Sequence, residues 1–62
     1  MRFYRLFKLN ADGHIVGVCE WVCADDAQVL GAAMDLLAAE REAVTGIEAW
    51  RGATMIVKLA RD

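Results

Sequence analysis

Hydrophobic positions follow a strand-like pattern at both ends of the chain and a helix-like pattern between them. Residues 2–9 carry aromatic residues and leucines among basic ones, and residues 14–22 are rich in Ile, Val and Trp. Both compositions favour β-strands. Asn10 and Gly13 occupy the first and fourth positions of the intervening segment, which is typical of a type I turn closed by a left-handed glycine. Residues 2–22 are therefore predicted to form one β-hairpin.

The middle of the chain changes to good helix formers. Asp25, followed three residues later by Gln28, resembles a capping box. The predicted helix starts there and runs to about Val44, with Gly46 as its C-terminal stop. Spacings of three and four residues predict one apolar stripe for the core. Its members are Ala27, Leu30, Ala33, Met34, Leu37, Ala38 and Val44.

Residues 47–51 and 54–60 alternate more cleanly and predict a second strand pair. A type I turn over residues 49–52 assigns the side chains to two faces. The predicted core face holds Ile47, Ala49, Met55, Val57 and Leu59. The opposite face holds Glu48, Trp50, Thr54, Ile56 and Lys58.

The element order β-β-α-β-β predicts a single α+β domain over residues 1–62. Its sheet is expected to have four antiparallel strands, with one helix packed on one face. A chain of 62 residues has material for one core and no second domain.

The first hairpin is apolar on both sides, so its register decides which side faces the core. The preferred turn puts Phe3, Phe7, Leu9, Ile15, Cys19 and Trp21 on one side, with Trp21 assigned to the core. It puts Tyr4, Leu6, Val16, Val18 and Val22 on the other. A two-residue turn at Asp12 and Gly13 re-pairs the strands by one position, so the register stays open.

One helix covers one face of a sheet, which leaves the other face without a partner. The predicted uncovered face combines Tyr4, Leu6, Val16, Val18, Trp50 and Ile56, with a rim formed by Arg2, Lys8, Glu20, Glu48 and Lys58. An apolar patch rimmed by charge marks an interface, and a symmetric homodimer is the commonest way to close one. Scattered surface hydrophobic residues are the alternative.

Composition and charge exclude several classes of function. Hydrophobic residues make up 58% of the chain and charged residues 26%, with a net charge of −2. No stretch approaches the roughly 18 apolar residues of a membrane span, and basic residues interrupt every apolar run near the N-terminus. A cytoplasmic location is therefore expected, without a membrane partner. Residues 23–46 carry five acids and one base, so the helix is acidic and is expected to face outward.

Few residues of the chain are candidates for catalysis or for binding a cofactor. The chain has no Ser, one His and two Cys, so no nucleophile stands with a base and no zinc ligand set is complete. Cys19 and Cys23, about 13 Å apart along one strand, cannot form a disulfide and are interpreted as small buried hydrophobic residues. His14 follows a turn glycine and is expected at the surface. Asp25 and Asp26 interact with the helix N-terminus, where their charge would repel a phosphate. The sequence predicts no enzyme activity, cofactor or metal.

Four short motifs carry a resemblance to a known group of proteins. They are Tyr4-Arg5-Leu6-Phe7, Asp12-Gly13-His14-Ile15, Asp25-Asp26-Ala27 and Glu48-Ala49-Trp50-Arg51-Gly52. Together they resemble a group of short uncharacterised bacterial proteins common in alphaproteobacteria. The resemblance implies a bacterial cytoplasmic protein and no particular mechanism.

The leading hypothesis is a homodimeric interaction or scaffold module, with a further protein as another possible partner. Trp50, which precedes a turn and is expected to point outward, belongs to a residue type enriched at interfaces. The second hypothesis is a binder of a small ligand or single-stranded nucleic acid that stacks bases on Tyr4 and Trp50. A pI near 5.2 argues against nucleic acid, because neutralisation of phosphate supplies much of such affinity. An enzyme is the third interpretation.

Overall fold

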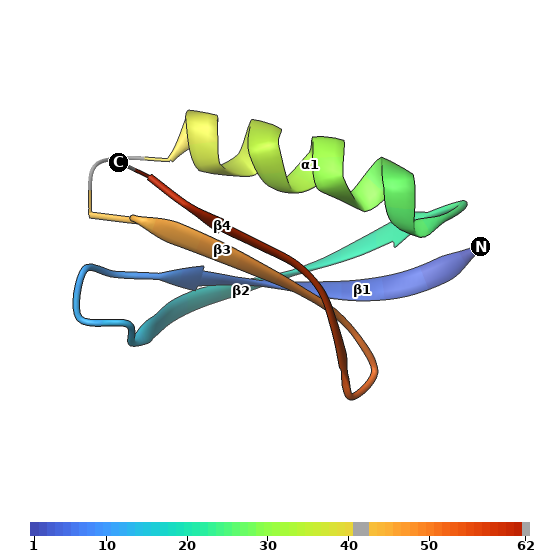
Figure 1. Ribbon diagram of the computed structural model, residues 1–62, viewed down its shortest axis with the longest axis horizontal. Coiled ribbons are helices and arrows are strands. Elements are labelled where there is room, and N and C mark those ends of the chain that lie inside the picture. The colour runs from blue at the N-terminus through green and yellow to red at the C-terminus, as the bar shows by residue number, and fades with distance from the viewer. Residues whose placement is uncertain (41–42, 62) are drawn as a thin grey trace.

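The helix and strands follow one another along the chain in the predicted order. The computed structural model describes residues 1–40 and 43–61. The elements are β1 (Arg2–Leu9), β2 (Ile15–Cys23), α1 (Asp26–Ala39), β3 (Gly46–Arg51) and β4 (Thr54–Ala60). The strands form one antiparallel sheet in the order β2-β1-β3-β4, and α1 lies across one face of it (Figure 1). The predicted α+β class, with one helix on a four-stranded sheet, is confirmed.

The turn of the first hairpin is the predicted one. The Asn10 carbonyl accepts a hydrogen bond from the Gly13 N–H at 2.9 Å, and the Asn10 N–H donates to the His14 carbonyl at 3.0 Å. The Asn10 side chain accepts from the N–H groups of Asp12 and His14, each at 3.0 Å. Gly13 has φ +81°, a backbone region that side chains with a Cβ rarely adopt.

A β-bulge next to this turn determines the register that the sequence left open. It also reverses the side of the sheet on which part of the hairpin's side chains were predicted to lie. Leu9 pairs with Ile15 and Lys8 with Gly17, so Val16 is an extra residue in β2. Because the side-chain direction alternates along a strand, one extra residue exchanges the two faces of everything beyond it. Tyr4 and Leu6 consequently pair with Trp21 and Cys19, and the predicted combination of sides is wrong.

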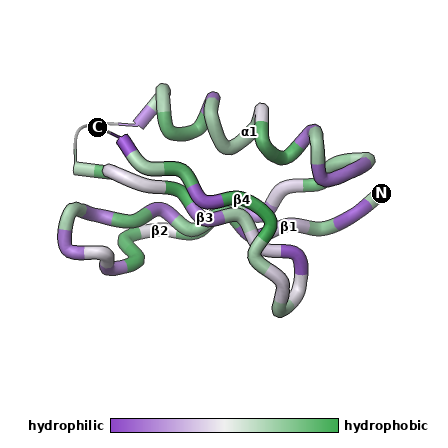
Figure 2. The backbone as a smooth tube through the Cα atoms, in the orientation of Figure 1, coloured by the Kyte–Doolittle hydropathy of each residue, from purple (hydrophilic) through white to green (hydrophobic). Residues whose placement is uncertain are grey.

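The buried core lies between α1 and the face of the sheet that carries Tyr4 and Leu6. Tyr4 is 1% exposed and Leu6 is 0% exposed, so their predicted place on the uncovered face is wrong. Trp21, predicted for the core, is 41% exposed on the edge strand β2. The buried hydrophobic residues of the described chain are Tyr4, Leu6, Cys23, Val29, Ala33, Val44, Ile47 and Ala49, with Leu36, Leu37, Ile56, Val57 and Leu59 packed against them. Figure 2 shows hydrophobic positions in all four strands as well as in the helix.

The helix is shorter than predicted. Asp25 caps it by accepting a hydrogen bond from the Gln28 N–H at 3.0 Å, as expected. At the other end, the Glu40 N–H still donates to the carbonyls of Leu36 and Leu37, but the backbone of Glu40 is extended, with φ −82° and ψ 159°. The helix therefore ends at Ala39 instead of about Val44. Residues 41 and 42 of the predicted helix lie outside the described residues.

Gly46 does not stop the helix but opens β3. A Cβ on this buried residue would lie 3.0 Å from the Leu59 carbonyl oxygen on the neighbouring strand. Close approach of the two strands therefore favours a glycine here, and helix capping does not explain it.

The helix also buries a different stripe from the predicted one. Val29 and Ala33 are fully buried, and Leu36 and Leu37 pack against the core. Leu30 and Met34 are 43% and 56% exposed. The buried side of the helix is therefore rotated away from the predicted stripe. Ala27 and Ala38 of that stripe are also exposed, and its Val44 is buried but lies beyond the end of the helix.

The second hairpin turns at a different position from the predicted one. Arg51 pairs with Thr54, so Gly52 and Ala53 form the turn, and Gly52 has φ +60°. Trp50 pairs with Met55 and Ala49 with Val57, which makes Ile56 an extra residue in β4. Met55, predicted for the core, is consequently 45% exposed. Ile47 and Ala49 lie in the core, and Val57 and Leu59 pack against it, as predicted.

Candidate functional site

The face of the sheet opposite α1 is the candidate site, and we call it the open face. Its side chains alternate along β1 with the buried ones, which places Phe3, Arg5 and Phe7 on this side. Across β2, Phe3 pairs with Val22, Arg5 with Glu20 and Phe7 with Val18. Across β3, Arg5 pairs with Trp50 and Phe7 with Glu48. Cross-strand pairs share a side of the sheet, so all of these residues belong to the open face.

Large apolar side chains lie uncovered on this face. Phe3 is 73% exposed, and Ile15, Val16, Val18 and Val22 are exposed by roughly half or more. Burial of one such side chain contributes about 1.5–3 kcal/mol. The open face therefore retains apolar surface that the fold does not use for its own stability.

Charged residues on the open face balance one another. Arg5 lies opposite Glu20, and the Lys58 ammonium lies 4.0 Å from the Glu48 carboxylate. The Trp50 indole N–H donates to Glu48 at 3.1 Å, which fixes the half-buried ring beside this acid. Among the residues that the structure describes, the strands of this face thus carry two bases and two acids, whose charges cancel.

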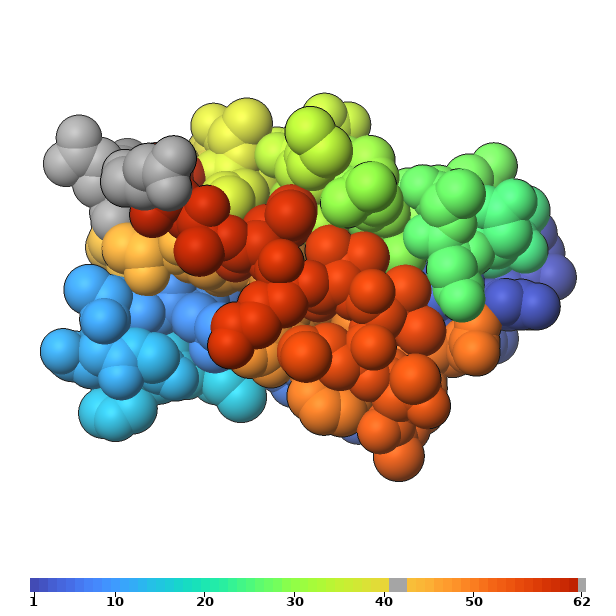
Figure 3. Space-filling view, in the orientation of Figure 1, coloured from blue at the N-terminus to red at the C-terminus, as the bar shows by residue number. Residues whose placement is uncertain are grey.

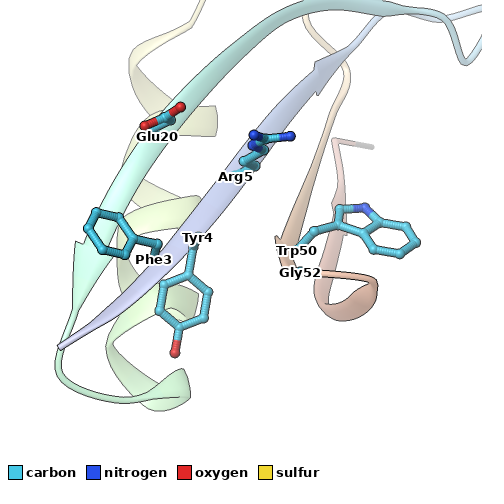
Figure 4. A pocket seen from close by; sticks show the side chains of 6 residues that line it. All are labelled: Phe3, Tyr4, Arg5, Glu20, Trp50 and Gly52. Atoms are coloured by element: carbon cyan, nitrogen blue, oxygen red, sulfur yellow. The ribbon is translucent and has the colours of Figure 1, made fainter.

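Two adjoining hollows mark the surface around Arg5 and Trp50. The larger has a volume of about 480 Å³ and is lined by Phe3, Tyr4, Arg5, Glu20, Trp50 and Gly52. The other, about 360 Å³, is lined by Arg5, Phe7, Ile15, Glu48, Trp50, Gly52 and Ala53. In Figure 4, Glu20 lies beside Arg5 on the neighbouring strand, and the Trp50 ring points away from Phe3.

The larger hollow exists because β1 and β3 separate. Their pairing ends at Arg5 and Trp50, and the β3-β4 hairpin then diverges from the start of β1 (Figure 1). The residues of β1 before Arg5 consequently have a strand partner on the β2 side only. The gap leaves space beside Phe3 that a side chain or a small molecule can enter.

The predicted interface residues divide between the two faces. Val16, Val18 and Trp50 are accessible on the open face, whereas Tyr4 and Leu6 are in the core. Ile56, at the bulge of β4, packs partly against the core. The open face gains Phe3, Phe7, Ile15 and Val22, which the sequence did not select. Residues on both sides of β1 are apolar, so hydropathy alone could not distinguish its two faces.

A second polar cluster joins the start of α1 to the sheet. The Asp26 carboxylate accepts a hydrogen bond from the buried Tyr4 hydroxyl and two from one Arg51 nitrogen, at 2.7 and 2.8 Å. Arg2 approaches the same carboxylate at 3.4 Å. The sequence predicted an interaction of Asp26 with the helix N-terminus and missed these partners, which come from strands distant in the chain.

This cluster shifts the pKa values of its members. The Tyr4 hydrogen bond, and then the Arg51 guanidinium, hold the pKa of Asp26 below its ordinary value of 3.8. Burial, followed by the hydrogen bond to Asp26, raises the pKa of Tyr4 above 10.0. Because each donor ends on the same carboxylate, the cluster joins the start of the helix to the sheet.

Side chains from outside the helix also bind the C-terminal end of α1. The Arg61 guanidinium donates to the Leu37 carbonyl and, at 3.3 Å, to the Glu40 carbonyl. A cation at a helix C-terminus complements the helix dipole. Lys8 forms an ion pair with Glu40, and the hydrogen bond between these two side chains raises the pKa of Lys8.

In the part of the chain that the structure describes, no site for a metal ion or for a catalytic nucleophile is assembled. No group of three or more His, Cys, Asp or Glu side chains is placed to hold a metal ion there. Cys23 is buried, Cys19 is half-buried and neither is in a disulfide. His14 is exposed after the first turn. Among residues 1–40 and 43–61, no helix has the length and apolar character needed to cross a membrane.

Comparisons with protein-family models, curated proteins and solved structures find no match to this chain. The predicted bacterial group therefore stays a prediction.

Proposed function

We propose that the chain is a homodimeric interaction module without catalysis, whose open face packs against the same face of a second copy. The observation that carries this proposal is the row of exposed apolar side chains on the open face. Phe3, Val18 and Val22 are 73%, 56% and 45% exposed although they lie within regular strands. Contiguous apolar surface of this kind marks interaction sites on small proteins.

The charge pattern supports a second copy as the partner. In a two-fold interface the same patch meets itself, so a patch of one sign would repel its copy. The open face instead pairs Arg5 and Lys58 with Glu20 and Glu48. Each base can therefore meet an acid of the other copy, which gives orientation as well as affinity.

The size of the face also supports this proposal. A standard interface removes about 800 Å² from each partner. That is about a fifth of this chain's accessible surface of 4178 Å². In a molecule of one sheet and one helix, the open face forms one whole side, so it can supply an area of this order.

We further propose that the module acts in the cytoplasm. Cys19 and Cys23 are both free thiols, and a reducing compartment keeps thiols in this state.

The two hollows support a second candidate function, the binding of a small ligand. Trp50 and Arg5 line both hollows and offer an aromatic ring and a guanidinium to a planar or anionic group. The single-stranded nucleic-acid version loses one of its two stacking residues, since Tyr4 is buried. We therefore rank nucleic-acid binding below the homodimer.

Val18→Lys tests the homodimer. The change places an uncompensated charge on the open face at an exposed position, so the fold should survive while the dimer dissociates. Ala39→Lys is the matched control, because it adds the same charge at an exposed position of α1. Native mass spectrometry of both variants and of the wild type at several concentrations reports the number of chains.

We expect association in the wild type and in Ala39→Lys, with a dissociation constant at least about tenfold higher in Val18→Lys. An unchanged mass distribution in Val18→Lys, with an intact circular dichroism spectrum, would contradict the open-face dimer. Mass beyond whole chains in the gently purified wild type would favour the small ligand, and Trp50→Ala should then remove that mass.

A further inference from the structure

A second surface, separate from the open face, runs along the outer side of β4. The strand order places β4 at an edge of the sheet, so the outward backbone groups of Thr54–Ala60 have no strand partner among the described residues. In Figure 3 the atoms of β4, in orange to red, lie on the near side of the molecule, with the helix directly along them. Unpaired N–H and C=O groups in a row form a template for another strand.

The helix presents an apolar flank beside this edge. Leu30 and Met34, one turn apart, are 43% and 56% exposed, and the small Ala38 follows one turn later. A hollow of about 380 Å³ joins this flank to the strand. Its lining consists of Met34, Leu37, Ala38, Leu59, Ala60 and Arg61. The sheet edge and the helix flank are therefore one continuous surface.

We propose that a second copy of the chain pairs with β4 in the antiparallel direction and extends the sheet to eight strands. The helix flank of each copy then packs against that of the other. This interface goes beyond the open-face dimer and does not depend on it, because it uses the edge of the sheet at β4 and the helix layer instead of the open face.

The dimensions of the two layers favour a copy of the same chain over a short peptide. The seven residues of β4 span about 24 Å, and the 14 residues of α1 span about 21 Å. A lone peptide strand could satisfy the β4 backbone but would leave Leu30 and Met34 uncovered. A second copy brings a helix of its own beside the strand edge, so it can cover this flank as well as pair with β4.

The bulge and the charge of β4 select the register. Beyond the extra residue Ile56, the strand pairs regularly with β3 from Val57 to Ala60. Cross-strand partners share a side of the sheet, so a two-fold pairing is centred on one residue and its copy. A centre at Lys58 would place two ammonium groups opposite each other, which destabilises a pair.

A centre at Leu59 avoids this repulsion. Each Lys58 then lies beside Ala60 of the second copy, and the two Leu59 side chains meet on the helix side of the sheet. Leu59 lines the hollow under Met34, so this register also closes the apolar flank. Arg61 does not oppose the approach, because the helix carbonyls of Leu37 and Glu40 already hold its guanidinium.

Met34→Lys is the test, with Ala39→Lys again as the matched control. Met34 is exposed, so the substitution should leave the fold intact while it places two charges within the joined helix flanks. Two measurements apply to the wild type, to Met34→Lys, to the control Ala39→Lys and to Val18→Lys. Native mass spectrometry counts the chains, and hydrogen exchange follows the amides of residues 57–60.

We expect Met34→Lys to weaken association at least about tenfold and to accelerate exchange at the outward amides of β4. Val18→Lys should keep these amides protected, since the two surfaces are separate. Unchanged mass and unchanged β4 exchange in folded Met34→Lys would overturn the edge pairing. Failure of the open-face dimer would appear instead as an unchanged mass in Val18→Lys, so the two failures are distinguishable.

Discussion

Asp26 is the residue on which most polar contacts between the helix and the sheet converge. It is the first residue of α1, and the strand residues Tyr4 and Arg51 both donate to its carboxylate. The same group lies at the positive end of the helix dipole. Its negative charge is therefore stabilised by two strands and by the helix at once, which makes the stability of the fold sensitive to its ionisation.

Unfolding at low pH should depend on Asp26. Its pKa in the folded chain lies below the ordinary 3.8, so the unfolded chain binds the proton first as the pH falls. The stabilisation is complete above the unfolded pKa and is lost as the pH drops through the folded pKa. Asp26→Asn should lower the thermal midpoint at neutral pH and flatten its decline below about pH 4.

The measurement is thermal unfolding at a series of pH values, with Asp35→Asn as the control. Asp35 is exposed on the same helix and makes none of the hydrogen bonds described for Asp26. An equal flattening in both variants would mean that general helix charge, and not the cluster with Tyr4 and Arg51, sets the acid response.

At the scale of the element, the orientation of α1 distinguishes buried from accessible apolar residues. Val29 is 0% exposed, whereas its neighbour Leu30 is 43% exposed. Both are hydrophobic residues inside the same helix, and only packing against the sheet separates them. This difference gives a direct test of which stripe the helix buries.

Val29→Ala should destabilise the fold by about 2 kcal/mol, because it removes two buried methyl groups and leaves a cavity. Leu30→Ala removes more carbon atoms but from an exposed position, so it should cost well under 1 kcal/mol in the free chain. Urea unfolding of the two variants measures the difference. A greater loss for Leu30→Ala at low protein concentration would indicate the stripe predicted from spacing.

For the whole molecule, the proposed association would be coupled to the stability of the fold. A chain of 62 residues has a small core, which among the described residues consists of eight buried hydrophobic residues and five packed against them. A partner that binds only the folded chain adds stability by mass action. The thermal midpoint should therefore rise with protein concentration over several decades. A constant midpoint, with the mass of one chain throughout, would contradict both proposed interfaces.

The sequence by itself determined the element order, the α+β class and the first turn, because these depend on local composition and spacing. Asn10 and Gly13 identified the turn, and Asp25 identified the start of the helix, since a turn or a cap satisfies neighbouring backbone groups. The sequence also predicted that one helix leaves one sheet face uncovered. That conclusion follows from counting layers and does not require the register.

The tertiary structure alone decided which residues occupy each face. The extra residue Val16 in β2 reverses the alternation, and the extra residue Ile56 in β4 moves Met55 out of the core. Neither bulge has a local signal, because apolar residues stand at both alternating sets of positions. Gly46 likewise resembled a helix stop in the sequence, and only the structure shows that the closeness of the adjacent strand explains the glycine.

The partners of Asp26 show the same limit. Tyr4 and Arg51 lie 22 and 25 residues away in the chain, and only the pairing of β1 with β3 brings them to the helix start. Local patterns therefore determine which elements form, since hydrogen bonds within turns and helices involve near neighbours. Register and burial depend on contacts between distant segments, and these decide the surface that the chain offers to a partner.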